Sequence, residues 1–520
     1  MPGALSESRK ELLEKFLRGR ATADGKPQGI VRSGRSEAPV SYGQQQIWLH
    51  SQFSSPMPIY NEMVTIRYLG VLDRVAFEKT FTEIIRRHEA WRTTFEWKGA
   101  ELMQYIQASP RHIEIPYLDV SALPEDTREQ AALQTVKKAA LEPYDLAIGP
   151  MYRPRLVRYA PEDHRLFLGL HHIIFDGVSL YGVLLPELQV LYEAFSNGCP
   201  SPLKELRLQY SDYAVWHREW VKSIAPEQLE YWSSKLHGIE DREVLPIDYP
   251  RRQTQSYRGA TELLVLDAER SMALKDLSKR QGMTLFMTLL ASLYALLWVY
   301  TGEDDLMVGC TSSGRSRSET ENMLGFFLNT IALRIDLSGD PSFLDLMERA
   351  REELLSSLDH DAIPFEFLVE NLCEQRAGGK HPFFQVLFAF QPPLAPLHPS
   401  WRFSQMDIDL GLTKFDLHLE LDERPEGIIG RFMYNIDLFD RRTIQGMVNR
   451  WQAIVARVVA DPSVRLSQLA QDFEKPKAAR PELVPDPTTA EELDFATKPA
   501  GWIQSIRKIL RFDRSDGGGA

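Results

Sequence analysis

Hydrophobic positions along the middle of the chain alternate between helical and strand-like spacing. Residues 74–88 carry a stripe at helical intervals, made of Phe77, Phe81, Ile84 and Ile85. This pattern predicts an amphipathic helix, for which Asp73 is a suitable N-cap. Residues 165–172 are apolar on both faces, which predicts a central β-strand that is covered on both sides. We expect a helix to follow from Asp176 as N-cap to about Phe195, kinked or restarted by Pro186.

The second half of the chain repeats this alternation. The same patterns predict helices over 284–300, 343–358 and 441–459, and strands over 305–309, 384–390 and 428–435. A stretch with Pro and Arg, 245–257, separates the two halves. Because a single hydrophobic core rarely serves a chain of this length, the sequence predicts an α/β protein of two similar lobes, 39–245 and 246–472.

The two ends of the chain differ from this body. Residues 1–38 are expected to form a short helix, 8–18, followed by a Gly-, Ser- and Arg-rich linker. In the segment 473–520, a Pro- and Glu-rich linker precedes an amphipathic helix near 502–511. A helix of about ten residues is marginal alone, so we expect this one to pack on a partner. Folding back onto the body is the alternative.

Composition and charge exclude several classes of protein. The 520 residues carry a net charge of −12 and no basic stripe, which argues against nucleic acid as the main partner. The three cysteines, Cys199, Cys310 and Cys373, form no CxxC pair, which favours a reducing, cytoplasmic setting. The most apolar stretch, 284–300, is short for a membrane span and typical of a buried helix. No membrane partner is therefore expected.

The segment LGLHHIIFDGVSLYG, 168–182, holds the candidate chemistry. His171 and His172 are adjacent on a predicted strand and therefore point to opposite faces, which argues against a shared metal ion. His171 is expected to be structural. His172 stands at the strand end beside the helix N-terminus at Asp176-Gly177, where free backbone N–H groups and a proton acceptor would meet. This arrangement suits acyl transfer, with a buried Asp176 paired to an arginine.

The same segment resembles the HHxxxDG signature of condensation domains of nonribosomal peptide synthetases, and more widely of chloramphenicol-acetyltransferase-like acyltransferases. Six further blocks follow the order and spacing of that family, covering about 39–470. They are SYGQQQIW (41–48), RHEAWRTTF (87–95), YSDYAVW (210–216), VGCTSSGR with MLGFFLNT (308–315 and 323–330), HDAIPFE (360–366) and HPFFQVLFAFQ (381–391).

This resemblance implies a fold and a set of roles. The fold would be a V of two acetyltransferase-like lobes with an active-site tunnel at their junction. His172 matches the catalytic histidine, while His171 and Asp176 match its structural support. Gly177 matches the residue whose N–H lies near the developing oxyanion. Arg315 matches the arginine of the fifth block and is a candidate partner of Asp176.

The resemblance also implies the partners of the chain. Carrier proteins would deliver the substrates on phosphopantetheine arms, so the chain itself would bind no cofactor or metal. The chain would act as a monomer, transferring an acyl thioester to an amine or a hydroxyl group. The tail, 473–520, favours a free-standing enzyme and would dock on a carrier or on a component of a polyketide or peptide synthase.

Two other functions remain open from the sequence. One is a coenzyme A-dependent acyltransferase of the same superfamily, and the other is a non-elongating domain that docks carriers without forming a bond. Departures from the family pattern at Gln46, Asp361-Ala362 and His381 leave the histidines intact. They place the handling of the acceptor in question, because the last two of these positions belong to the second lobe.

Overall fold

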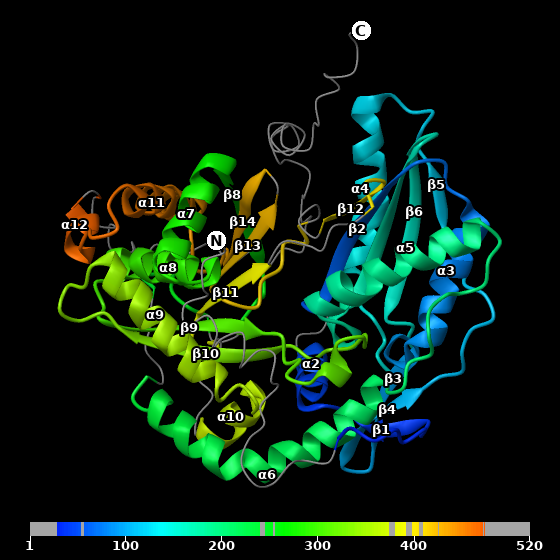
Figure 1. Ribbon diagram of the computed structural model, residues 1–520, viewed down its shortest axis with the longest axis horizontal. Helices are drawn as coiled ribbons and strands as arrows, with labels where there is room; N and C mark the ends of the chain where they lie inside the picture. Colours follow the sequence, from blue (N-terminus) through cyan, green and yellow to red (C-terminus); the bar gives the residue numbers. More distant parts are fainter. Residues whose placement is uncertain are drawn as a thin grey trace, which may run out of the picture.

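Two mixed α/β lobes stand side by side in the computed structural model and diverge from a shared base (Figure 1). The structure describes residues 29–53, 57–239, 245–252, 255–373, 380–391, 398–404, 409–424, 426–471 and 473. The expected helices at 8–18 and 502–511, with their linkers, lie outside the described residues. The expected α/β class is confirmed, and the arrangement of the two lobes in Figure 1 is consistent with the expected V.

The first lobe is built on a sheet with the strand order β12-β2-β7-β6-β5. Its strands are β2 (Asn61–Leu69), β5 (Tyr117–Asp119), β6 (Tyr152–Ala160), β7 (Asp163–His171) and β12 (Trp401–Ser404). The pairs are antiparallel except for β5 with β6, which run parallel. A smaller sheet joins β1 (Glu37–Pro39), β4 (Glu101–Ile106) and β3 (Thr93–Lys98).

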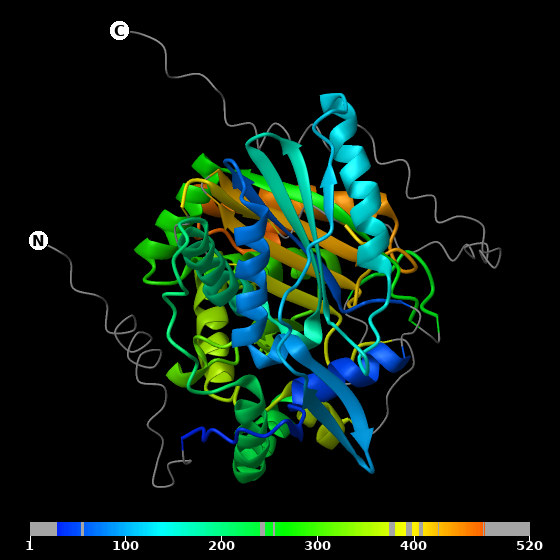
Figure 2. The same ribbon diagram turned by 90° about the vertical axis from the view of Figure 1, so that its right-hand side faces the viewer.

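The central strand β7 is covered on both faces, as its sequence predicts. Leu166, Leu168 and Leu170 pack into the core that contains α3 (Arg74–Arg87) and α5 (Leu185–Ser196). Phe167 faces the opposite way, toward α4 (Glu125–Leu141). Figure 2 shows α4 on one side of these strands and α3 on the other. Because side chains alternate along a strand, His171 belongs to the face of Phe167.

The second lobe has a sheet with the strand order β10-β9-β11-β13-β14-β8. The strands are β8 (Gly259–Asp267), β9 (Asp305–Ser312), β10 (Asn329–Asp336), β11 (Val386–Gln391), β13 (Leu417–Arg424) and β14 (Gly427–Asn435). The helices of this lobe are α7 (Ala268–Arg280), α8 (Leu285–Thr301), α9 (Phe343–Leu358), α10 (Phe365–Leu372), α11 (Arg441–Ala460) and α12 (Leu466–Gln471).

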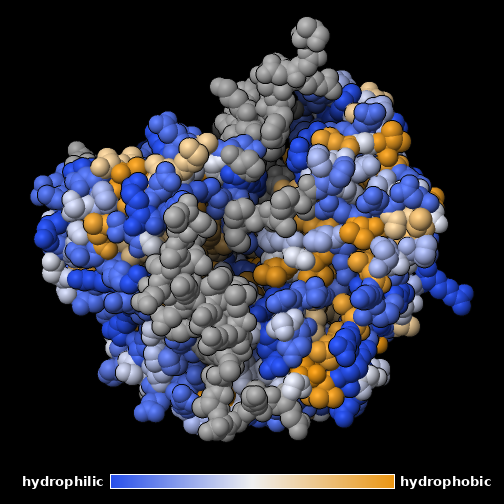
Figure 3. Space-filling view, viewed as in Figure 1, coloured by the Kyte–Doolittle hydropathy of each residue, from blue (hydrophilic) through white to orange (hydrophobic). Residues whose placement is uncertain are grey.

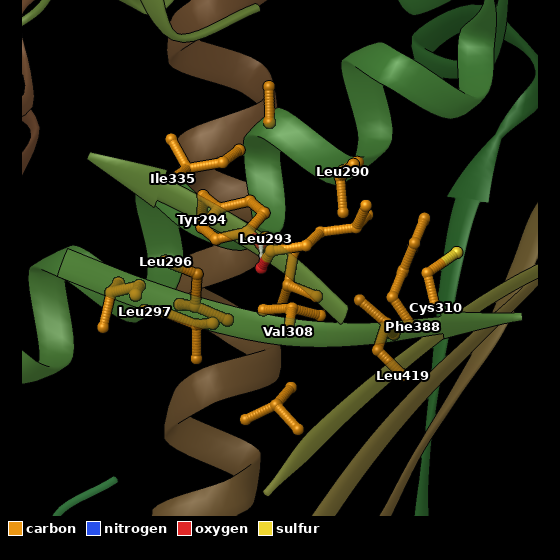
Figure 4. Packing of buried hydrophobic residues seen from close by; sticks show 14 of the residues in the cluster. Leu290, Leu293, Tyr294, Leu296, Leu297, Val308, Cys310, Ile335, Phe388 and Leu419 are labelled. Carbon is orange, nitrogen blue, oxygen red and sulfur yellow. Dashed lines mark hydrogen bonds between the residues drawn. The ribbon is translucent and has the colours of Figure 1, made fainter. Parts of the chain in front are cut away.

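The apolar stretch at 284–300 forms α8, the central helix of this lobe. Thr284 caps its N-terminus by accepting the Met287 N–H, and Gly302 ends it in a left-handed conformation. Leu290, Leu293 and their neighbours pack between the sheet and the flanking helices (Figure 4). Among the described residues, no single helix is long and apolar enough to cross a membrane. On the face seen in Figure 3, hydrophilic side chains predominate.

Three segments tie the lobes together. Helix α6 (Tyr210–Leu236) runs beneath both lobes in Figure 1. Its first turns pack into the first core and its later turns into the second, so the packing changes ahead of the boundary expected at 245. Strand β12 comes from the second half of the chain but pairs with β2. The loop at 323–327 likewise leaves the second lobe to pack into the first core.

The helix after Asp176 differs in detail from the expectation. It begins at Gly177 with a short helical turn, passes through a π-helical segment at Ser179–Leu184, and becomes α-helical in α5. Pro186 lies in the first turn of α5. A proline at that position lacks only an N–H that the first turn of an α-helix would not use. Leu184 and Leu185 keep helical backbone angles, so the helix continues past Pro186 and the expected restart does not occur.

Candidate active site

His172 lies where β7 ends, in the short 3-10 turn His172–Ile174, or η2. Its backbone N–H donates to the Tyr60 carbonyl at 2.9 Å, which continues the pairing of β7 with β2 by one residue. The imidazole stacks on the Phe175 ring, with 4.7 Å between centroids. The edge contact with Phe326, at 5.5 Å, comes from the second half of the chain. The catalytic candidate therefore stands where the two lobes meet.

Hydrogen bonding determines which nitrogen of His172 carries the proton. Nδ1 lies 3.2 Å from the Phe175 carbonyl oxygen, and a carbonyl can only accept. Nδ1 is therefore protonated, and Nε2 of the neutral ring is left as a proton acceptor. Burial lowers the pKa of His172 to about 3, and the positive charge of Lys414 adds to this effect. The ring is therefore neutral at pH 7, but it is a weak base.

His171 is buried on the opposite side of the strand. Its Nδ1 accepts the Ile173 N–H at 3.3 Å, and its Nε2 lies 3.4 Å from the Ser51 hydroxyl. The Tyr144 ring meets it edge-on, and burial lowers the pKa of His171 to about 3. Both nitrogens thus have partners within the fold. Over the described ranges, no group of three or more His, Cys, Asp or Glu side chains could hold a metal ion.

Asp176 is buried, and both of its carboxylate oxygens accept hydrogen bonds. Oδ1 accepts the Ser179 N–H at 2.7 Å, which confirms the expected N-cap. Oδ2 accepts the Phe327 N–H at 2.9 Å. The guanidinium of Arg315 donates to Oδ1 at 3.1 Å, and the two side chains are 2% and 4% exposed. The suggested pair of Asp176 with Arg315 is therefore present, and it joins the two lobes directly behind His172.

Ser179 completes this connection, although the sequence did not single it out. Its hydroxyl donates to the Gly325 carbonyl at 2.8 Å. The same oxygen lies 2.9 Å from the Arg315 guanidinium and 3.1 Å from the Gly325 N–H. Arg315 also donates to the carbonyls of Thr320 and Met323 and covers the Phe327 ring at 4.0 Å. A buried network of charge-assisted bonds thus fixes the loop of the second lobe against the helix start.

Gly177 is the first residue of the helix and lies close to the second lobe. A Cβ at this position would lie 3.4 Å from the Tyr181 ring and 3.5 Å from the Gln391 amide nitrogen. Gln391 is the last residue of β11. The backbone at Gly177 therefore lies at the lobe junction, next to the Gln391 side chain of the sheet of the second lobe. Its suggested contact with an oxyanion stays a prediction.

Lys414 is a second charged group near the histidines that sequence reasoning missed. Its ammonium lies 4.7 Å from the centre of the Tyr60 ring. Burial lowers the pKa of Lys414, against the opposing effect of Glu62 and Glu420. Glu420 also pairs with Arg431 at 2.6 Å across neighbouring strands. The second lobe therefore carries buried charged side chains here, of which Lys414 acts on His172; alternation along β13 could have indicated the buried Glu420.

Two of the departures from the family pattern have structural roles. Asp361 accepts a hydrogen bond from the Ser312 hydroxyl at 2.8 Å. His381 stacks on the Phe365 ring, and its own ring lies 4.5 Å from that of Phe384. Burial lowers the pKa of His381 to about 4, so this histidine is a neutral packing group. Neither change touches the network around Asp176.

Comparison with known proteins identifies the family. The family model described as "Condensation domain" matches residues 35–477. A linear gramicidin synthase of Brevibacillus parabrevis is 39% identical over 440 residues, which are 83% of this chain and 8% of that protein. Phosphinothricin tripeptide synthetase PhsC of Streptomyces viridochromogenes is 34% identical over 474 residues, which are 90% and 43%. The chain thus spans less than half of either relative.

Solved structures agree with this result. The X-domain in its complex with OxyB from teicoplanin biosynthesis is 27% identical, with a TM-score of 0.74 over 86% of this chain and 99% of that one. The first condensation domain of the calcium-dependent antibiotic synthetase, bound to a substrate analogue, is 19% identical. Its TM-score is 0.72 over 84% of this chain and 99% of that one, and it shows the similarity of fold alone.

Proposed function

Because the chain belongs to the condensation domain family of nonribosomal peptide synthetases, we propose that it joins a carrier-bound acyl thioester to the amine of an acceptor, with His172 as catalytic residue. The product is an amide bond in natural-product biosynthesis. The observation that carries this proposal is the neutral imidazole of His172, whose Nδ1 is engaged by the Phe175 carbonyl, while Nε2 has no hydrogen-bond partner in the part of the chain that the structure describes. The coenzyme A-dependent and non-elongating alternatives have no comparable support from the comparisons.

The chemistry assigned to His172 is a proton transfer within the tetrahedral intermediate. The amine nitrogen attacks the thioester carbonyl, and the nitrogen of the adduct becomes positively charged and strongly acidic. A weak base is sufficient for that proton. Nε2 takes it and delivers it to the sulfur as the C–S bond breaks, which leaves an amide and a free thiol. Thus the low pKa of His172 is compatible with this step.

Three supporting roles complete the site. Asp176 and Arg315 hold the helix start and the opposing loop in one arrangement, so that the catalytic geometry is set before substrates bind. His171 acts as a buried packing group. The N–H of Gly177, at the positive end of the helix, is proposed to stabilise the carbonyl oxygen of the intermediate.

Carrier protein domains are the proposed partners, since both substrates would arrive as thioesters of phosphopantetheine. A tunnel at the lobe junction would admit the two arms, and the chain itself would supply no cofactor. The expected monomeric state, cytoplasmic location and division into segments at 38, 245 and 472 stay predictions.

Intact-mass analysis of a loaded donor carrier tests the function. The donor carrier, charged with a panel of acyl and aminoacyl groups, is mixed with the protein and aminoacyl-loaded acceptor carriers. Condensation transfers the donor mass to the acceptor carrier. His172→Ala should abolish most of this transfer, whereas His237→Ala, which changes an exposed histidine, should preserve it. Failure of the unmodified protein with every pair would reject the proposal, and transfer at the normal rate by His172→Ala would reject the site.

A further inference from the structure

A pocket that is partly open to solvent lies next to Phe326, between the start of α2 (Tyr42–Phe53), α6 and the start of α10. Ser41, Tyr213, His217, Trp220, Phe326 and Glu366 are among the residues that line it. The Phe326 ring also contacts the imidazole of His172 edge-on. One aromatic ring therefore touches both the catalytic residue and the cavity.

Glu366 is the unused carboxylate of this cavity. It is the second residue of α10 and is half-buried. Within the described part of the chain, no other side chain forms a hydrogen bond or ion pair with it, whereas Asp361 of the same cavity accepts from Ser312. Asn329 is likewise engaged by backbone groups. Glu366 is thus the carboxylate of the lining that remains available to a ligand.

Glu366 also acts electrostatically on Tyr60, a neighbour of His172. Its negative charge acts on the hydroxyl of Tyr60, whose pKa is raised mainly by burial. Tyr60 is the residue whose carbonyl accepts the His172 N–H. Burial raises the pKa of Glu366 itself to about 7, with a smaller effect from Glu370. The carboxyl therefore exchanges its proton near neutral pH, unlike an exposed glutamate.

The reaction needs such a group before His172 can act. An α-amine in water has a pKa near 7.7–8.0 and is largely an ammonium ion at neutral pH. An ammonium has no lone pair and cannot attack the thioester. With a pKa of about 3, His172 cannot hold the proton that must leave. A carboxylate with a pKa near that of the amine can accept it.

We propose that Glu366 binds the ammonium group of the acceptor and takes one proton from it, so that a neutral amine attacks the donor thioester. The carboxylate becomes a carboxylic acid and the ammonium becomes an amine, and the acid returns its proton to water after product release. Tyr213 and Trp220 belong to the lining of the same pocket. The acceptor class is therefore an amine rather than a hydroxyl compound, and this assignment rests on the proposed condensation.

A binding measurement with stable acceptor analogues tests this role. Glycyl-aminopantetheine, in which an amide replaces the thioester, carries the amine, and its glycolyl counterpart carries a hydroxyl group instead. Calorimetric titration of the full chain at pH 8 should show that the amine analogue binds about tenfold or more tightly, the size expected for a hydrogen bond to a charged group. Glu366→Gln should remove this preference.

The control is Glu370→Gln, which changes an exposed carboxylate on the same helix and should keep the preference. Equal affinity, or no binding, of both analogues to the unmodified protein would overturn the assignment, as would a preference that survives in Glu366→Gln. Thermal unfolding of each variant checks that it is folded.

Turnover distinguishes this inference from the proposed function. If the unmodified protein condenses and Glu366→Gln has the same kcat/KM for an amine acceptor, the role of Glu366 fails and the condensation stands. If the unmodified protein forms no product with any carrier pair, the proposed function fails. A tenfold or larger loss of kcat/KM in Glu366→Gln, with Glu370→Gln unchanged, supports both.

Discussion

Replacing Glu366 by Gln should stabilise the folded chain at pH 8 and leave its stability unchanged near pH 4. Burial raises the pKa of this carboxyl from 4.5 to about 7. An acid with a raised pKa contributes its full stability below the unfolded pKa and loses it as the pH rises through the folded pKa. Gln has nearly the shape of the neutral acid but carries no charge at any pH. The variant therefore avoids the cost of burying a carboxylate.

The size of the effect follows from the shift. Each pKa unit is worth about 1.4 kcal/mol, so the change from 4.5 to about 7 corresponds to at most about 3–4 kcal/mol at pH 8. Water entering the cavity screens part of this charge. The stabilisation should appear between about pH 5 and pH 8.

Urea unfolding at several pH values, followed by circular dichroism, measures this difference. The free energy of unfolding of the unmodified protein should fall below that of Glu366→Gln as the pH rises. Glu370→Gln, at an exposed position, should stay within about 0.5 kcal/mol of the unmodified protein throughout. A variant that is equally stable at every pH, or less stable at pH 8, would refute the reasoning, because the carboxylate would then be held by favourable partners.

Three further outcomes follow from the site and the sequence. His172→Ala should lower the condensation rate by about 10²–10⁴-fold with an unchanged circular dichroism spectrum, and a normal rate would contradict its role. Asp176→Ala should cost about 3–5 kcal/mol in urea unfolding, because it leaves the buried Arg315 without its partner; a loss below about 1 kcal/mol would show that the pair adds little. Deleting 476–520 should leave the melting temperature nearly unchanged and weaken turnover with a carrier more than with a small thioester, whereas equal loss with both donors would assign the tail to the body.

Local patterns in the sequence predicted the local parts of the fold. The stripe within 74–88 became α3, Arg74–Arg87, and the Asp73 side chain caps it by accepting the Ala76 N–H. The apolar run at 284–300 became α8, because a helix that is hydrophobic on all sides can only be buried. In both helices, the capping residue directly precedes the hydrophobic pattern. Residues that are close in the sequence were therefore sufficient to predict these helices.

The elements and site residues that the sequence did not predict depend mostly on contacts between distant parts of the chain. Helix α4 was missed because its buried side is formed mostly by alanines, which give a weak pattern. The four-residue strand β12 has no recognisable period, and its pairing with β2 joins residues more than three hundred positions apart. In the site, the pair of Asp176 with Arg315 could be suggested from the cost of an unpaired buried charge. Ser179 and Glu366 had no such signal, because their roles depend on which loops the fold brings together.

The pairing of β12 with β2 has a consequence for recombination between related synthetases. A chimaera joined at the middle of the chain would take β2 from one parent and β12 from the other. The same exchange would separate Asp176 from Arg315. In such a hybrid, β12 of one parent must pair with β2 of the other, and Arg315 of one parent must pair with Asp176 of the other. A hybrid that takes 315–327 and 401–404 from the same parent as the first lobe would keep both the strand pairing and the ion pair. These two segments must be transferred although they lie beyond the mid-chain junction in the sequence.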